Sequence, residues 1–586
     1  MVMLSKNARL RFTLDNKVVD APIEWEDISV NASFQENSMQ ADIDADSFTF
    51  SNDEAQYISQ WIANGNIFRG IPFKIDTYNV NQSRLAFDGF INCANDIQIY
   101  EDTTVSARIQ KAEGLNTLND RLEGLTLEYL YSINVINDSD FTEVKYVVEK
   151  NLNISEIVSN LILGYILVTQ LKAQVQSTSK AISNAVGHAT GGISGPASAI
   201  VFSIAVAIIE IAYTIFMIGA VINIGTDIFN MLVPFVRKHK SLNLRTALTK
   251  ISNHLGYSFN SNIDLLDTLH YLPSNNQTDD VNLITGIIDI PKGTKTGIPS
   301  ATDYGYTALE FFDICKKMFQ AKIQAKNGVL TFLSENDPYW LSTSTYTLPD
   351  ILKPVKKYNT DELIFSKLLQ FRTDEIADEW TLTNYKGTNY EIITDDPTIP
   401  ASSQAKYIKN HETINFNVAL GNRKDKLNGL ENSLKKLAKI VDDTVNFFGG
   451  NSNLEGKIKN KVGLLKQGTN NHTVPKIIYL NGSGKLPANH RSLFSAKVLY
   501  DRFINYRSFV LNNYGYQKSV YELENLPFGF EDFLKTIDNS IFTDINGGVG
   551  KFRELNWLVA GDKATATIEI NEPYCTSLVE TYIEVE

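Results

Sequence analysis

An uncharged apolar stretch in the middle of the chain constrains the fold more than any other feature. Residues 181–209 contain no Asp, Glu, Lys or Arg, and the run from Pro196 to Ile222 contains one charged side chain, Glu210. As a helix this run would be about 40 Å long at ~1.5 Å per residue, which exceeds the ~30 Å hydrocarbon thickness of a bilayer. Either lipid or other apolar protein surface must cover it.

The stretch is the second arm of a helical hairpin that we predict over residues 154–240. The first arm, ISEIVSNLILGYILVTQLKAQVQ, carries no charge between residues 157 and 171, and the second arm begins near Pro196, which suits the first turn of a helix. Both ends join folded domains, so we expect them on one side, with the uncharged tip free to cross a bilayer. The predicted tip residues are Gly187, His188, Gly191, Gly192, Gly195 and Pro196.

Small side chains recur every seven residues along the second arm. The predicted small-residue stripe for helix packing is Ser198, Ala205, Ala212, Gly219 and Thr226. Three places after each comes a β-branched or aromatic residue, giving the predicted seam Val201, Ile208, Ile215, Ile222 and Phe229. Small residues let helices approach closely in membranes, and the neighbouring track suits knobs-into-holes packing. In a helix that is almost wholly apolar, such a track also arises by chance.

Charged side chains occur at two places in the predicted hairpin, one within the second arm and one at its end. Glu210 lies opposite the small-residue stripe, and a carboxylate facing lipid is costly, so it is protonated, faces a polar lumen, or the helix rests outside lipid. The basic residues Arg237, Lys238 and Lys240 are expected to end the second helix. One interpretation is eventual membrane contact, and the other is a hairpin buried in a protein core or oligomer channel.

The net charge, the cysteine content and the first residues of the chain argue against several classes of protein. The 586-residue chain has a formal net charge of -13, which argues against gripping DNA through phosphate contacts but permits DNA to slide past. Its three cysteines, Cys93, Cys315 and Cys575, form no CxxC pair, so neither a disulfide framework nor a cysteine zinc site is expected. The first residues lack the apolar core of a secretory signal.

The sequence divides into six predicted segments of an α+β protein with β-rich, tube-like barrel or sandwich domains. These are a β-rich tube or hub domain over 1–125, a connector over 126–153, the hairpin over 154–240, an α+β hub region over 241–420, an amphipathic helix and linker over 421–473, and a mixed domain over 474–586. The first segment contains short strands such as ARLRFTL and PFKIDTY and one helix, DEAQYISQWIANG, that we expect to stop at Gly65.

The later segments contain helix-then-strand units. LNLRTALTKISNHLGYSF and YTALEFFDICKKMFQ each run as an amphipathic helix toward a strand, and AKIQA and VLTFL flank a Lys-Asn-Gly hairpin turn. Residues 422–448 are predicted to be helical, with a heptad pattern that fits either a helix on a core or a short oligomer seam. The heptad positions are Leu427, Leu430, Leu434, Leu437, Val441 and Phe448.

No catalytic, metal or cofactor motif is complete. LNGSGKLP lacks the first glycine and the Ser or Thr of a phosphate loop, and no histidine pair has metal-ligand spacing. Asp42, Asp44, Asp46 and Asp53 have calcium-loop spacing, but Ser47 replaces the required glycine. We therefore predict no enzyme activity, no catalytic or metal residues and no cofactor.

Several segments resemble the hub proteins of bacteriophage tail baseplates or tail tips. They are NIFRGIPFKIDTYN and LAFDGFIN near the start, the unit TALEFFDICKKMFQAKIQAKNGVLTF, and ELNWLVAGDKATATIEINEP near the end. The resemblance covers residues 1–125 and 241–420 loosely. It implies a homotrimer of tube-like β domains that closes the tail tube around the DNA channel, and it carries over no catalytic residue. The hairpin departs from the usual hub plan.

The combined prediction is a structural virion protein located in the tail. Its copies would form a ring through which phage DNA passes without sequence-specific binding, in contact with other tail proteins. The hairpins would plug the channel or insert into the host membrane, and so enter the host cell envelope, during genome delivery. One alternative is a pore-forming toxin with an inserting hairpin, and a second is a tail-associated cell-wall hydrolase.

Overall fold

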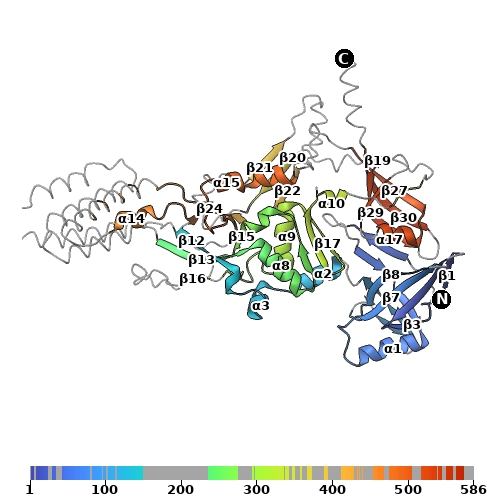
Figure 1. Cartoon of the computed structure of the whole chain (residues 1–586). Helices are drawn as coiled ribbons and strands as arrows, with labels where there is room; N and C mark the ends of the chain where they lie inside the picture. Colours follow the sequence, from blue (N-terminus) through green and yellow to red (C-terminus); the bar gives the residue numbers. More distant parts are fainter. Residues whose placement is uncertain are drawn as a thin grey trace, which may run out of the picture.

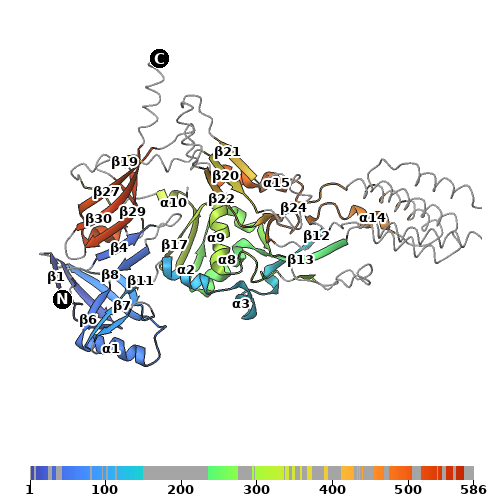
Figure 2. The ribbon, with the colours of Figure 1, turned by 180° about the vertical axis from the view of Figure 1, so that it is seen from behind.

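The computed structural model describes most of residues 2–148, 235–274, 294–349, 411–427, 453–467, 474–504 and 517–572, with short pieces over 357–393 and single positions between 432 and 442. Elements from the two ends of the chain lie together at one end of the molecule, and we call them the terminal unit. Most elements between residues 115 and 504 form the middle unit beside it, whereas β19 (Lys357–Tyr358) belongs to the terminal unit (Figures 1 and 2). The terminal strands are blue and red in these views, and the middle unit is mostly green and yellow.

One large sheet builds the terminal unit. Its first strands are β1 (Val2–Ser5), β2 (Ala8–Leu14), β3 (Lys17–Val19), β4 (Ser29–Ser33), β5 (Asp42–Ala45), β7 (Ile71–Asn79), β8 (Gln82–Ile91) and β11 (Ile109–Lys111). Its later strands are β19 (Lys357–Tyr358), β27 (Gln517–Pro527), β28 (Ile541–Thr543), β29 (Val549–Leu558) and β30 (Lys563–Glu572). The order is β1-β2-β7-β8-β11-β5-β4-β29-β30-β27-β19, with β3 on β2 and β28 on β29. The described elements confirm the predicted α+β class. The described strands form no closed barrel, so the barrel, one of the two predicted alternatives for the β-rich domains, is not found.

The strand pair β4–β29 joins the two ends of the chain. It is antiparallel, and its register places Val30 opposite Trp557 and Ala32 opposite Leu555. All four side chains are buried in one hydrophobic cluster that mixes residues from both ends of the chain. The segments predicted as separate first and last domains therefore share one sheet and one core.

A smaller sheet and the predicted helix complete the terminal unit. The sheet has the order β6 (Phe48–Ser51), β10 (Thr104–Ala107) and β9 (Gln98–Tyr100). Helix α1 (Asn52–Ala63) buries Ala55 and Ile58, and its Tyr57 hydroxyl donates to Asp15 at 2.5 Å. The helix ends as predicted, since Gly65 adopts a φ of +82° just after it.

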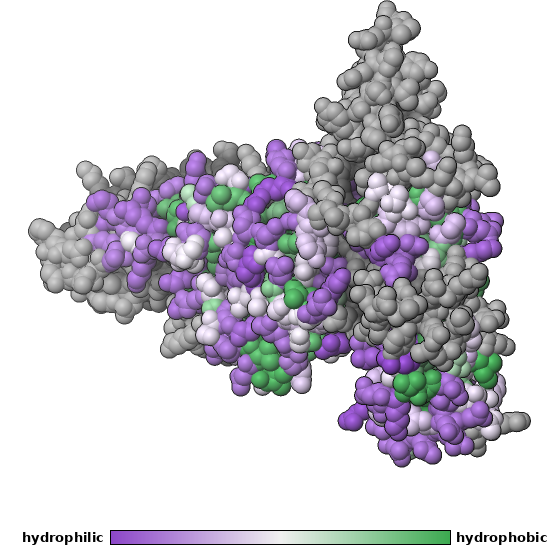
Figure 3. Space-filling model, turned by 45° about the vertical axis from the view of Figure 1, so that its right-hand side comes forward, coloured by the Kyte–Doolittle hydropathy of each residue, from purple (hydrophilic) through white to green (hydrophobic). Residues whose placement is uncertain are grey.

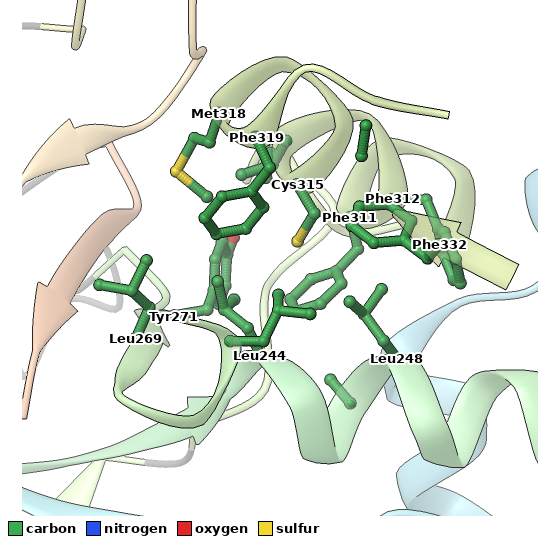
Figure 4. Packing of buried hydrophobic residues seen from close by; sticks show 14 of the residues in the cluster. Leu244, Leu248, Leu269, Tyr271, Phe311, Phe312, Cys315, Met318, Phe319 and Phe332 are labelled. Carbon is green, nitrogen blue, oxygen red and sulfur yellow. The ribbon is translucent and has the colours of Figure 1, made fainter. Parts of the chain in front are cut away.

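Helices α8 (Leu244–His254) and α9 (Ala308–Phe319) carry the core of the middle unit and confirm the two predicted amphipathic helices. They pack with α2 (Leu115–Glu123) and α3 (Leu127–Ser132) around large aromatic side chains. Figure 4 shows Leu244 and Leu248 of α8 facing Phe311, Cys315 and Phe319 of α9. The Tyr271 and Phe311 rings lie 5.6 Å apart in edge-to-face contact, a geometry that adds to simple burial.

The predicted hairpin after α9 is also confirmed. Strands β17 (Ala321–Lys326) and β18 (Val329–Ser334) pair across Asn327 and Gly328, which both have positive φ. Strand β14 (Ser258–Asn260), which follows α8, adds to the other edge of β18. Both helix-then-strand units therefore contribute to one three-stranded sheet.

A second sheet of eight strands crosses the middle unit. Its order is β23 (Ala419–Leu420), β26 (Lys476–Tyr479), β15 (Leu269–Leu272), β13 (Phe235–Asn243), β12 (Phe141–Val148), β25 (Leu465–Gln467) and β24 (Asn422–Arg423), with β16 (Thr294–Lys295) on β13. A third sheet has the order β21 (Asn389–Ile393), β20 (Ser366–Gln370) and β22 (His411–Asn415). Short helices complete the molecule: α10 (Pro338–Leu341), α14 (Leu454–Lys459), α15 (His490–Leu493), α16 (Ala496–Leu499), the π-helix Tyr500–Ile504 and α17 (Phe530–Thr536).

The helix predicted over 422–448 begins later than expected. Asn422 and Arg423 form strand β24, because their backbones pair with Lys466 and Leu465 of β25. Among the heptad positions, Leu427 is described and is not helical, and the others lie outside the described residues. The described positions farther on, at 432, 435, 439 and 442, are helical.

Replacing Thr307 by alanine is expected to destabilise the middle unit by about 1 kcal/mol, the usual value of an N-cap. The Thr307 hydroxyl accepts from the Glu310 amide at 3.2 Å, and the Glu310 carboxylate accepts from the Thr307 amide at 3.3 Å. Hydrogen exchange of the α9 amides would measure the loss. Thr307→Ser keeps the hydroxyl and should retain most of the protection, and equal losses in both variants would contradict a capping role.

Candidate functional site

Strands β12 and β13 lie on either side of the apolar segment, and we call this strand pair the insertion base. They pair antiparallel without a register shift from Phe141 opposite Leu242 to Val148 opposite Phe235. Paired Cα atoms in such a ladder are about 4.5–5.5 Å apart. Residues 149–234 therefore leave the sheet and return to it at the same point, so both ends lie on one side as expected.

The inner face of the insertion base is packed into the middle unit. Tyr146 is fully buried and Val144 nearly so. The hydrophobic cluster around them contains Leu272, Leu465, Ile478, Leu480 and Leu486. Burial of each large apolar side chain contributes about 1.5–3 kcal/mol, so the two strands form a rigid attachment rather than a loose linker.

Buried polar groups lie on the same inner face. Ser241 donates from Oγ to the Thr142 carbonyl at 3.1 Å, and the same Oγ lies 3.3 Å from His270 Nδ1. The His239 Nδ1 lies 2.7 Å from the Lys240 carbonyl and donates to it as Nδ1–H. Burial lowers the pKa of His270 to about 4, so the imidazole is neutral at neutral pH. Because Ser241 is fully buried, this serine–histidine pair serves structure and is closed to substrate.

The basic residues expected to end the second helix lie instead within strand β13. Strand alternation explains the difference, since His239 points into the core while Lys238 and Lys240 are on the opposite face. Lys238 pairs with Glu143 at 3.1 Å and Lys240 with Asp138 at 2.6 Å. Arg237 is in register with Tyr146 on the same strand pair.

The other predicted site residues lie outside the described residues. These are the tip over 187–196, the small-residue stripe and seam over 198–229, and Glu210. Within the part of the chain that the structure describes, no helix is both long and apolar enough to span a bilayer. The same part contains no group of three His, Cys, Asp or Glu side chains placed to hold a metal ion.

A second insertion, the chain segment between β24 and β25, leaves the same sheet beside residues 149–234. Strand β24 ends at Arg423 opposite Leu465, where β25 begins, so residues 424–464 also leave and return together. Strand β25 pairs in turn with β12 over Tyr146–Val148. Figures 1 and 2 place α14, which belongs to this insertion, at the end of the molecule far from the terminal unit.

Sequence reasoning missed strand β12 and placed it in the connector over 126–153. The signal was present in part, because the four residues Glu-Val-Lys-Tyr within FTEVKYVV alternate charged with apolar side chains. Two of the three cysteines, Cys93 and Cys315, are buried free thiols, and burial raises the pKa of both.

On the face seen in Figure 3, polar side chains cover most of the described surface, and apolar side chains form small separate patches.

No protein-family model matches the chain, and no curated protein matches it. Among solved structures, it is similar to a 43 kDa tail protein of prophage MuSo2 from Shewanella oneidensis, at 8% identity and a TM-score of 0.31, covering 96% of this chain and 98% of that one. It is also similar to the prophage tail protein gp18 from Listeria monocytogenes EGD-e, at 7% identity and a TM-score of 0.32, covering 98% of both chains. TM-scores this low do not establish a shared fold.

Proposed function

We propose that this chain is a structural protein of a bacteriophage tail, placed as a hub at the baseplate or tail tip. The sequence resemblance of its first and middle segments to tail hub proteins supports the proposal. In this role its copies form a homotrimeric ring around the DNA channel and contact other tail proteins. The net charge of -13 favours a channel that repels the DNA backbone and lets the DNA pass.

In this hub, the apolar segment is the part that plugs the channel or enters the host membrane. The observation that carries the proposal is the pairing of Val148 with Phe235. It makes residues 149–234 a single insertion whose two ends are held by the insertion base. An insertion with an uncharged tip can pack against the same segment of the other subunits and plug the channel. It can then extend into the host membrane, and so into the host cell envelope, during genome delivery.

A lysine in the apolar segment should remove most membrane activity. Ile208→Lys places a charge at the centre of the second arm, which costs about 2.5–3.5 kcal/mol on membrane-insertion scales. Dye leakage from lipid vesicles mixed with the full chain would measure the loss of membrane activity in the variant. Val18→Lys is the matched control, because Val18 is 65% exposed on β3 in the terminal unit. Absence of leakage from the wild-type chain at every pH would leave the plug role alone.

The oligomeric state separates the hub from a pore-forming toxin. A hub forms a closed ring in solution, and the native mass should correspond to three chains. A toxin of this kind is a monomer that assembles only on lipid. A monomeric mass in solution together with lipid-dependent assembly would reject the hub.

A further inference from the structure

Two arginines and a histidine gather beside the insertion base without enough partners of their own. Arg423 ends strand β24, and His490 and Arg491 begin helix α15. Arg491 donates from one Nη to the Asn422 side chain at 3.1 Å, which brings α15 against β24. His490 is 3% exposed, and burial lowers its pKa. The charges of Arg491 and Arg423 lower the pKa further, while Asp425 and the Pro487 carbonyl oppose the shift.

The donors of this cluster are only partly used. Arg423 Nε, Arg491 Nε and both ring nitrogens of His490 are buried without a hydrogen-bond partner. A buried polar group without a partner costs about 1–3 kcal/mol, so each of these nitrogens calls for a partner such as a bound ion or an ordered water. The Nε–Nη edge of an arginine is also the edge that makes paired hydrogen bonds to phosphate or carboxylate oxygens.

The charges of the cluster leave room for an anion. Arg423 pairs with Asp425 at 2.8 Å, and this carboxylate is 47% exposed. Arg491 bonds to the neutral amide of Asn422 and makes no ion pair with any residue that the structure describes. Gly463, with φ of +89°, runs beside Arg423, and a Cβ there would lie 3.1 Å from Arg423 Nη2. The Arg423 guanidinium therefore packs directly against the Gly463 backbone, in a place that a side chain at residue 463 would crowd.

We propose that Arg423, Arg491 and His490 form an oxyanion site that binds a phosphate group, supplied by a lipid headgroup or by free inorganic phosphate. Three donor groups from two elements suit a tetrahedral anion better than a carboxylate, which offers two oxygens. The site is well placed for a headgroup, because Arg423, Leu465 and Tyr146 are in register across β24, β25 and β12. At about 4.8 Å per strand, Arg423 lies about 10 Å from the strand that leads into the apolar segment.

Calorimetric titration of the full chain with inorganic phosphate at pH 7, in chloride at fixed ionic strength, tests the site. Wild-type protein should show saturable binding, and Arg491→Gln should weaken it at least tenfold. Lys74→Gln removes the same charge from the terminal unit and should bind like wild type. Asp425→Asn should strengthen binding several-fold, because it frees Arg423 from its competing carboxylate. This variant changes an exposed side chain and so guards against a folding defect in Arg491→Gln.

No saturable binding by wild type, equal losses in Arg491→Gln and Lys74→Gln, or weaker binding in Asp425→Asn would each overturn the proposal. Preincubation with phosphatidylcholine–phosphatidylglycerol vesicles identifies the source. Loss of the phosphate heat assigns the site to a headgroup, and an unchanged heat assigns it to free phosphate. The headgroup source rests on the membrane role proposed above, but phosphate binding does not. Phosphate binding without vesicle leakage would therefore reject only the membrane role.

Discussion

Replacing Trp557 by alanine should lower the free energy of unfolding of the terminal unit by about 3–5 kcal/mol, the usual range for a buried tryptophan. Trp557 is 2% exposed and stacks on Phe533 of α17 at 4.9 Å between ring centroids. It also lies opposite Val30 in the strand pair that joins the two ends of the chain. The cavity would open where both ends contribute to the core, so we expect strands β4 and β5 to lose stability with β29.

Hydrogen exchange resolved by segment, combined with urea unfolding, would measure this effect. Leu558→Ala is the matched control, because Leu558 is the next residue of β29 and is 37% exposed. We expect it to cost less than about 1 kcal/mol. If Trp557→Ala weakens protection in β29 and β30 but leaves β4 and β5 unchanged, the two ends are independent units and the shared core is wrong.

Acidification should destabilise the middle unit through His270. Its pKa is about 4 in the folded protein, because burial disfavours the charged ring, against about 6.5 when the chain is unfolded. Between these values the unfolded state binds more protons, so stability is present above pH 6.5 and is lost as pH falls toward 4. Going from pH 7.5 to pH 4.5 should cost about 2–3 kcal/mol from this group alone.

Unfolding free energies at the two pH values, followed by exchange of the β13 and β15 amides, would check the window. His270→Asn removes the titrating group, so its loss of stability between pH 7.5 and 4.5 should be smaller than that of wild type by about 2–3 kcal/mol. His254→Asn replaces an exposed histidine at the end of α8 and should keep the full acid loss. The same pH dependence in His270→Asn and wild type would assign the acid effect to other groups.

Local patterns predicted the helices and the hairpin well. In α9, the apolar residues Phe312, Cys315 and Phe319 share a face that the structure buries, and Thr307 with Glu310 forms a capping box. The β17–β18 turn was readable because Asn-Gly tolerates positive φ at both positions. These signals depend on residues within one turn or one hairpin, so a single sequence contains them.

Non-local pairing was not predictable in the same way. The alternation in β4 and β29 shows which face each strand buries but not which strand it pairs with. The sequence alone therefore predicts separate domains for the two ends. The run from Arg237 to Lys240 fitted a helix end by charge alone, and the pairing of β12 with β13 decides that it is a strand. The oxyanion site combines β24 with α15, and neither element carries a complete motif by itself.

The joining of β4 to β29 also determines when the terminal unit can be completed during synthesis. Strand β4 leaves the ribosome more than five hundred residues before its partner strand β29. At ~5–20 residues per second, this delay lasts about half a minute to two minutes. During that time the nascent chain presents an unpaired strand edge while a long apolar segment is also being made. Cells that make this protein should therefore need chaperones to hold the early strands until the last strands close the sheet.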